Sequence, residues 1–159
     1  KKEENLSQAS PLSQTSPPDE VGAPVFLTLH GTGVAATSHA DSTKLGKIDG
    51  SGGYHYGITA MWVVAPSRHG AHNWEGVGRH VALSALFSLR AAIEFYLYVS
   101  SYPQMSLPLP LLDQIVFAGH SMGGHGGLLL AAHSWRRAVG GAFLAAWIDK
   151  EHYGDANRS

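Results

Sequence analysis

The stretch FAGHSMGGHGG, residues 117–127, follows the apolar run QIVF and precedes the apolar run LLLAA. One serine, Ser121, lies among glycines where a strand-like segment changes into a helix-like one. Gly119 and Gly123 lie two residues before and after it, and the spacing G-x-S-x-G is typical of a sharp connection from a strand to a helix. Glycine in a helix costs about 1 kcal/mol relative to alanine, so this many glycines indicate close backbone approach or backbone strain.

Four short apolar runs predict the strands of a parallel sheet, because continuous apolar residues suit strands that are buried on both faces. The runs are residues 25–29, 61–65, 114–118 and 142–147. Residues 78–99 carry apolar side chains at spacings of three and four, which predicts a helix, and a second helix is expected from Met122 to about Arg137. Right-handed crossovers then give an α/β fold with a mostly parallel sheet and helices on both faces. Residues 31–57 are expected to be mostly loop.

Composition bounds the organisation and the partners of the chain. A length of 159 residues with 44% hydrophobic side chains favours one domain. Residues 1–23 are rich in Ser, Gln and Pro, which predicts a disordered tail or linker, and residues 24–159 form the expected domain. The formal net charge of −1 gives no basic field for nucleic acid, and the absence of cysteine excludes disulfides and thiolate metal sites.

The sequence contains no pattern of a signal peptide or of a membrane span. The N-terminal residues KKEENLSQAS lack an apolar segment, and Arg90 and Glu94 interrupt the apolar stretch of residues 81–99. We therefore expect no membrane span, and the sequence assigns no compartment.

Two backbone N–H groups are candidates to bind an oxyanion beside Ser121. The helix that begins near Met122 presents unpaired N–H groups at its N-terminus, and the N–H of Met122 comes directly after the serine. The segment LHGTG, residues 29–33, follows the first strand, and a His-Gly turn there directs the N–H of Thr32 or of Gly33 toward the same cleft.

The loop after the second strand, residues 65–78, is expected at the same edge of the sheet, where ligands bind in open α/β folds. Arg68, His69, His72 and Trp74 are candidates to line a substrate pocket there. The alternative is an ordinary surface loop in which Trp74 packs onto the core.

Histidines near these segments raise the question of a metal site. His69 and His72, together with His120 and His125 if the fold brings them close, supply the ligand type, but the spacing fixes no third ligand. We expect no metal and no cofactor.

The strings GHSMGGHGG and LHGTG resemble the α/β-hydrolase superfamily of serine hydrolases, specifically esterase-D-type carboxylesterases and prolyl-oligopeptidase-like catalytic domains. The resemblance covers the N-terminal part of such a domain, residues 24–147, through the nucleophile elbow and the following strand. It implies that Ser121 is the nucleophile and that Met122 and Thr32 supply the oxyanion-hole N–H groups. The expected substrate-binding residues are the loop and elbow positions His30, Gly31, Gly33, Arg68, His69, His72, Trp74 and His120.

A serine nucleophile needs a histidine base and an acidic residue that orients it. Asp149 follows the last predicted strand and is a candidate acid, whereas His152 lies only three residues later and His133 falls within a helix. Two interpretations remain. The chain is a fragment of a hydrolase of ester or peptide bonds that lacks the acid and base and is inactive alone, or it is a non-catalytic α/β-hydrolase-like binding module.

Overall fold

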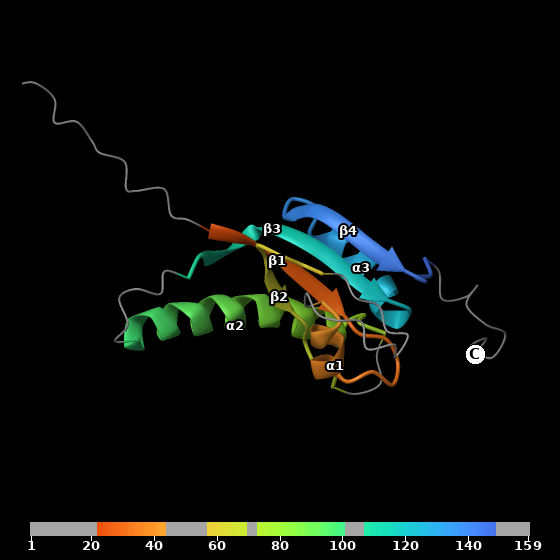
Figure 1. Cartoon of the computed structure of the whole chain (residues 1–159). Coiled ribbons are helices and arrows are strands. Elements are labelled where there is room, and N and C mark those ends of the chain that lie inside the picture. The colour runs from red at the N-terminus through yellow and green to blue at the C-terminus, as the bar shows by residue number, and fades with distance from the viewer. Residues whose placement is uncertain (1–21, 44–56, 70–72, 101–106, 149–159) are drawn as a thin grey trace, which may run out of the picture.

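The computed structural model describes residues 22–43, 57–69, 73–100 and 107–148. A sheet of four parallel strands forms its centre, in the spatial order β2-β1-β3-β4 (Figure 1). The strands are β1 (Gly22–Leu29), β2 (Trp62–Val64), β3 (Leu109–His120) and β4 (Ala138–Leu144). The predicted α/β fold with a parallel sheet is confirmed.

Three helices cover the two faces of the sheet: α1 (Ala36–Asp41), α2 (Val77–Val99) and α3 (Met122–His133). Leu27 of β1 packs in one core with Leu86 of α2 and Leu130 of α3. The next residue of β1, Thr28, points to the opposite face and bonds His39 of α1. The arrangement follows from right-handed crossovers, because the chain moves across the sheet in one direction through α2 and α3 and in the other through α1.

Several element boundaries differ from the expected ones. β1 begins at Gly22, two residues before the domain start expected at residue 24, because Gly22 pairs with Leu109 at the beginning of β3. β3 therefore starts five residues earlier than expected, and its pairing with β1 shifts in register after Pro24. β4 covers residues 138–144 instead of 142–147, and α1 is a short helix inside a segment expected to be mostly loop.

Helix α2 is only partly covered by the rest of the described structure. Ala82 and Leu86 in its first half are fully buried, whereas Phe95 is 67% and Tyr98 is 87% exposed. The second half of the helix projects past the strands (Figure 1). By length and composition alone, α2 also meets the criterion for a membrane-spanning helix. The expectation that the chain spans no membrane therefore stays a prediction.

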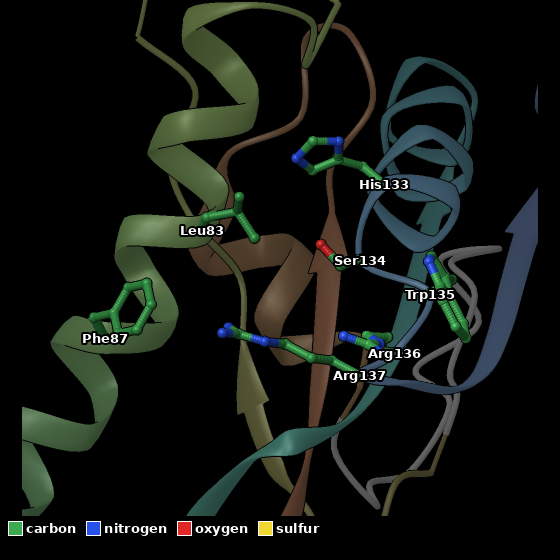
Figure 2. A pocket seen from close by; sticks show the side chains of 7 residues that line it. All are labelled: Leu83, Phe87, His133, Ser134, Trp135, Arg136 and Arg137. Atoms are coloured by element: carbon green, nitrogen blue, oxygen red, sulfur yellow. The ribbon is translucent and has the colours of Figure 1, made fainter.

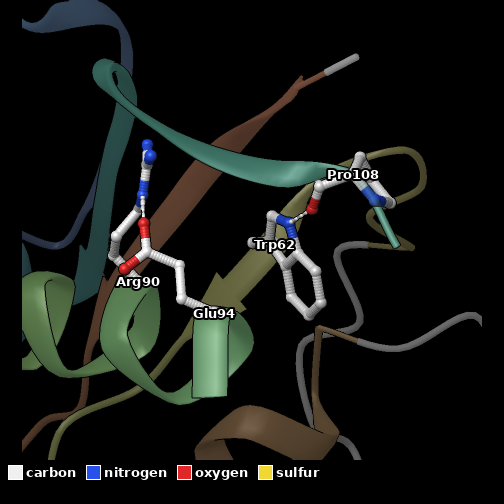
Figure 3. A network of polar contacts seen from close by, with 4 residues as sticks. All are labelled: Trp62, Arg90, Glu94 and Pro108. Carbon is white, nitrogen blue, oxygen red and sulfur yellow. Dashed lines mark hydrogen bonds and ion pairs between the residues drawn. The ribbon is translucent and has the colours of Figure 1, made fainter. Parts of the chain in front are cut away.

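Polar contacts on this side of the molecule tie β2 to the start of β3 and pair two charges on α2. The indole N–H of Trp62 donates to the carbonyl oxygen of Pro108 over 2.9 Å, and Arg90 forms an ion pair with Glu94 one turn later (Figure 3). The expectation of no membrane span rests on Arg90 and Glu94, and these two charged residues form an ion pair on the helix surface.

Candidate active site

Ser121 occupies the turn between β3 and α3 in a strained backbone conformation. Its φ and ψ angles are 56° and −122°, which place a residue with a side chain in a region that favours glycine. Backbone hydrogen bonds hold the turn on both sides, because the N–H of Ser121 donates to Leu144 and its carbonyl accepts from His125, over 2.8 and 3.0 Å. The surrounding structure thus maintains a conformation that is unfavourable by itself.

The glycines around Ser121 permit contacts between backbone segments that a side chain would prevent. A Cβ atom on Gly119 would lie 2.2 Å from the carbonyl oxygen of Gly123, on the other side of the turn. A Cβ on Gly123 would lie 1.8 Å from the carbonyl oxygen of Leu29, at the end of β1. The glycines expected to provide clearance for a sharp turn are therefore required where the strand meets the helix.

The loop after β1 lies directly against this turn. A Cβ on Gly31 would be 3.1 Å from the carbonyl oxygen of His120 and 3.5 Å from the Cβ of Ser121. β1 and β3 are neighbouring strands whose outgoing connections cover opposite faces of the sheet, and such a switch point is where open α/β sheets bind ligands. The segment HGTG and the serine turn, 90 residues apart in sequence, meet at this position.

Thr32, Met122 and Arg68 converge beside Ser121. The Thr32 hydroxyl contacts the Met122 sulfur at 3.7 Å, and the Arg68 guanidinium contacts the same sulfur at 2.9 Å. Met122 is the first residue of α3, so its N–H has no acceptor within the helix and lies at the positive end of the helix dipole. The site therefore places a helix N-terminus at a half-buried serine and a guanidinium against the side chain of the residue that follows it.

His30 and Trp74 are structural parts of the loop after β1. The His30 ring accepts from the N–H of Arg68 at Nε2 over 3.2 Å, so its Nδ1 carries the proton and donates to the Gly31 carbonyl over 2.9 Å. Trp74 is fully buried, and its indole N–H donates to the His30 carbonyl over 3.0 Å. Trp74 therefore packs in the core, as the alternative interpretation of this loop states, and both ring nitrogens of His30 form hydrogen bonds.

His125, on the first turn of α3, forms a buried contact with two other loops. Its Nε2 lies 2.8 Å from a carboxylate oxygen of Glu75, and its Nδ1 lies 2.8 Å from the carbonyl oxygen of Trp147. The ring also stacks on the Trp147 indole, with 4.9 Å between ring centroids. These contacts hold the ring between the two loops. Nothing in the sequence spacing predicted that Glu75 and His125 would meet.

The sequence also contained no indication of a role for His39. This residue lies buried against β1, on the face of the sheet opposite α2 and α3. Its Nε2 and the Thr28 hydroxyl are 2.7 Å apart. Burial, with smaller contributions from the nearby His30 and His120 rings, lowers the pKa of His39 from 6.5 to about 4. The His39 ring is therefore neutral at physiological pH and acts as a hydrogen-bonding core residue.

The other expected site residues lie at varied positions. Gly33 has a φ of 76° in an exposed turn, His69 is exposed and lines a separate pocket against α2, and His120 is half-buried beside Ser121. His72 and Asp149 lie outside the described residues. Within the described ranges, no group of three or more His, Asp or Glu side chains could hold a metal ion.

The Ser121 hydroxyl has no hydrogen-bond partner among the residues that the structure describes, so none of their imidazoles is in place as its base. Comparisons with protein-family models, with curated proteins and with solved structures find no significant match to this chain.

Proposed function

We propose that the protein is a serine hydrolase that cleaves ester or peptide bonds by acyl transfer to Ser121. The observation that carries the proposal is the combination of the strained Ser121 backbone with the loop at Gly31 packed against it. A strained serine between a strand and a helix N-terminus is the arrangement of a nucleophile elbow. Strain of this kind persists where function requires a side chain to be held in one position.

In the proposed reaction, Ser121 Oγ attacks the carbonyl carbon of the substrate, and the carbonyl oxygen becomes an oxyanion. The N–H groups of Met122 and Thr32 donate to that oxyanion, and collapse of the intermediate expels the alcohol or amine and leaves an acyl group on Oγ. Water then releases the acid and restores the serine. The Arg68 guanidinium, held at the Met122 sulfur, adds positive charge against the side chain of the residue that follows Ser121.

The proton of Ser121 Oγ must pass to a base in the first step. Of the described imidazoles near the site, His30 and His125 bind other partners through both ring nitrogens. No described imidazole bonds to Ser121 Oγ, and the candidate acid Asp149 lies outside the described residues. This feature also favours a second candidate function, a non-catalytic module that binds a ligand at the same switch point.

Chemical rescue distinguishes the two functions. The protein is incubated with a fluorophosphonate probe, with and without free imidazole as a substitute base, and labelled residues are identified by peptide mass mapping. The hydrolase proposal predicts a label on Ser121 that forms faster with imidazole. Ser121→Ala removes the label, whereas Ser134→Ala, a matched change at the other end of α3, leaves it unchanged. A binding module would show no preference for Ser121 over Ser134 in either condition.

A further inference from the structure

A second pocket lies at the opposite end of α3 from Ser121. It has a volume of about 380 Å³ and is formed between the C-terminal end of α3, the turn that comes after it and the first half of α2 (Figure 2). Because α3 contains 12 residues, the pocket is about 18 Å along the helix from the serine turn. The pocket is therefore separate from the candidate active site, and a ligand bound there would be independent of the proposed hydrolase function.

Two arginines give this pocket its charge. Arg136 and Arg137 both line it, and neither has a carboxylate within ion-pair distance among the described residues. The C-terminus of α3 carries about half a negative charge, which two guanidinium charges exceed. An anion entering the pocket would therefore meet net positive charge.

Both guanidiniums lie over aromatic rings and next to a fixed backbone. The Arg136 guanidinium carbon is 5.5 Å from the Trp135 ring centroid, and that of Arg137 is 6.0 Å from the Phe87 ring centroid. Contact with a ring occupies the face of a guanidinium and leaves its N–H edges available to an anion. The Arg137 backbone is held by hydrogen bonds to Ser134 and Ile115, over 2.8 and 2.7 Å. The two side chains thus extend from an ordered turn.

The remaining residues that line the pocket indicate which class of anion it binds. Ser134 and His133 add a hydroxyl and an imidazole on the α3 side, and Leu83 and Phe87 provide an apolar wall on α2 (Figure 2). Two guanidinium forks, a hydroxyl and an imidazole together offer more donors than the two oxygens of a carboxylate need. A phosphomonoester has three terminal oxygens and matches this donor set better.

We propose that this pocket binds a phosphomonoester group carried on an apolar or aromatic body. The phosphate accepts from Arg136, Arg137 and Ser134, and the attached body packs on Leu83 and Phe87. The same group could belong to a soluble organic phosphate or to a lipid headgroup, and the two sources are distinguished by experiment.

Calorimetric titration with phenyl phosphate tests the soluble source, and cosedimentation with phosphatidylcholine vesicles, with and without phosphatidic acid, tests the lipid source. We expect Arg136→Gln/Arg137→Gln to weaken binding of whichever probe binds by at least about tenfold, the loss expected when a charge-assisted hydrogen bond is removed. Arg79→Gln, which removes a charge from α2 outside the pocket, is the matched control and should bind as the wild type does. Phe87→Ala should weaken binding of phenyl phosphate but not of inorganic phosphate.

Binding of phenyl phosphate supports a soluble ligand, and binding only to vesicles that contain phosphatidic acid supports a lipid headgroup. The proposal is overturned if the wild type binds neither probe, or if the double variant binds as tightly as Arg79→Gln. If the double variant does not fold by circular dichroism, the single variants Arg136→Gln and Arg137→Gln make the same comparison. Arginines that only stabilise the end of α3 would lower the melting temperature when replaced and leave probe binding unchanged.

Discussion

Replacement of Gly123 by alanine tests the packing of α3 against the end of β1. The added Cβ would lie 1.8 Å from the Leu29 carbonyl oxygen, and the neighbouring contacts are with the Leu29 carbonyl carbon and the His30 oxygen. All three are backbone atoms of the last residue of β1 and of the residue that follows it, so no side-chain rotation relieves the overlap. An ordinary carbon-to-oxygen contact is about 3.3 Å, so the helix N-terminus would have to move by about 1.5 Å.

Two opposing effects set the magnitude of this change. Overpacking of this kind costs about 3 kcal/mol, at the upper end of the usual range, because the obstructing atoms are backbone. Alanine in a helix regains about 1 kcal/mol relative to glycine. We therefore expect Gly123→Ala to lower the free energy of unfolding by about 2 kcal/mol.

Urea unfolding followed by circular dichroism measures this difference, with Gly140→Ala as the matched control. A Cβ on Gly140 would meet only the Val116 side chain, at an ordinary 3.6 Å, so that variant should be as stable as the wild type or up to about 1 kcal/mol more stable. The close approach of α3 to β1 is refuted if Gly123→Ala unfolds within about 0.5 kcal/mol of Gly140→Ala.

Three further outcomes are expected. Ser121→Gly should have a free energy of unfolding about 1 kcal/mol higher than Ser121→Ala, because only glycine relieves the strained φ and ψ angles; equal values in denaturant melts would contradict the strain. Because the pKa of His39 is lowered in the folded protein, the unfolded chain binds more protons between pH 6.5 and 4, so stability should fall by up to about 3 kcal/mol as the pH drops through that range. His39→Gln should lose this part of the pH dependence, and an unchanged pH profile would refute the assignment. Without added imidazole, the chain should hydrolyse p-nitrophenyl acetate no faster than Ser121→Ala, and turnover dependent on Ser121 would show that the chain itself contains a base.

The fold was predictable where the residues that cause an element to form are close together in the sequence. The apolar run before Ser121 and the glycines after it required a strand, a sharp turn and a helix, and these elements meet at Ser121 as expected, although β3 begins earlier and α3 ends at His133 instead of near Arg137. The first part of β3 was missed because residues 109–113 contain Pro110 and the exposed polar residue Asp113, which hide a strand that pairs with β1. Its pairing partner lies more than 80 residues away, so no local signal could have shown it.

The candidate site was predictable in part for the same reason. Gly31 and Ser121 each follow a strand, and parallel strands end at the same edge of the sheet, so the motifs predicted a shared cleft but not that β1 and β3 are neighbours. The contact between Glu75 and His125 joins a loop to a helix face over 50 residues and follows no repeating pattern. For Trp74 the sequence left two interpretations open, a residue that lines a pocket and a residue of the core. Its complete burial in the structure decides for the core.

The most direct test of the proposed nucleophile is a crystal structure of the protein after phosphonylation with the fluorophosphonate probe in the presence of imidazole. We expect a covalent bond from Ser121 Oγ to phosphorus, with the phosphonyl oxygen about 2.7–3.1 Å from the backbone nitrogens of Met122 and Thr32. An unmodified Ser121, or a phosphonyl oxygen directed away from both nitrogens, would contradict the assignment of nucleophile and oxyanion hole.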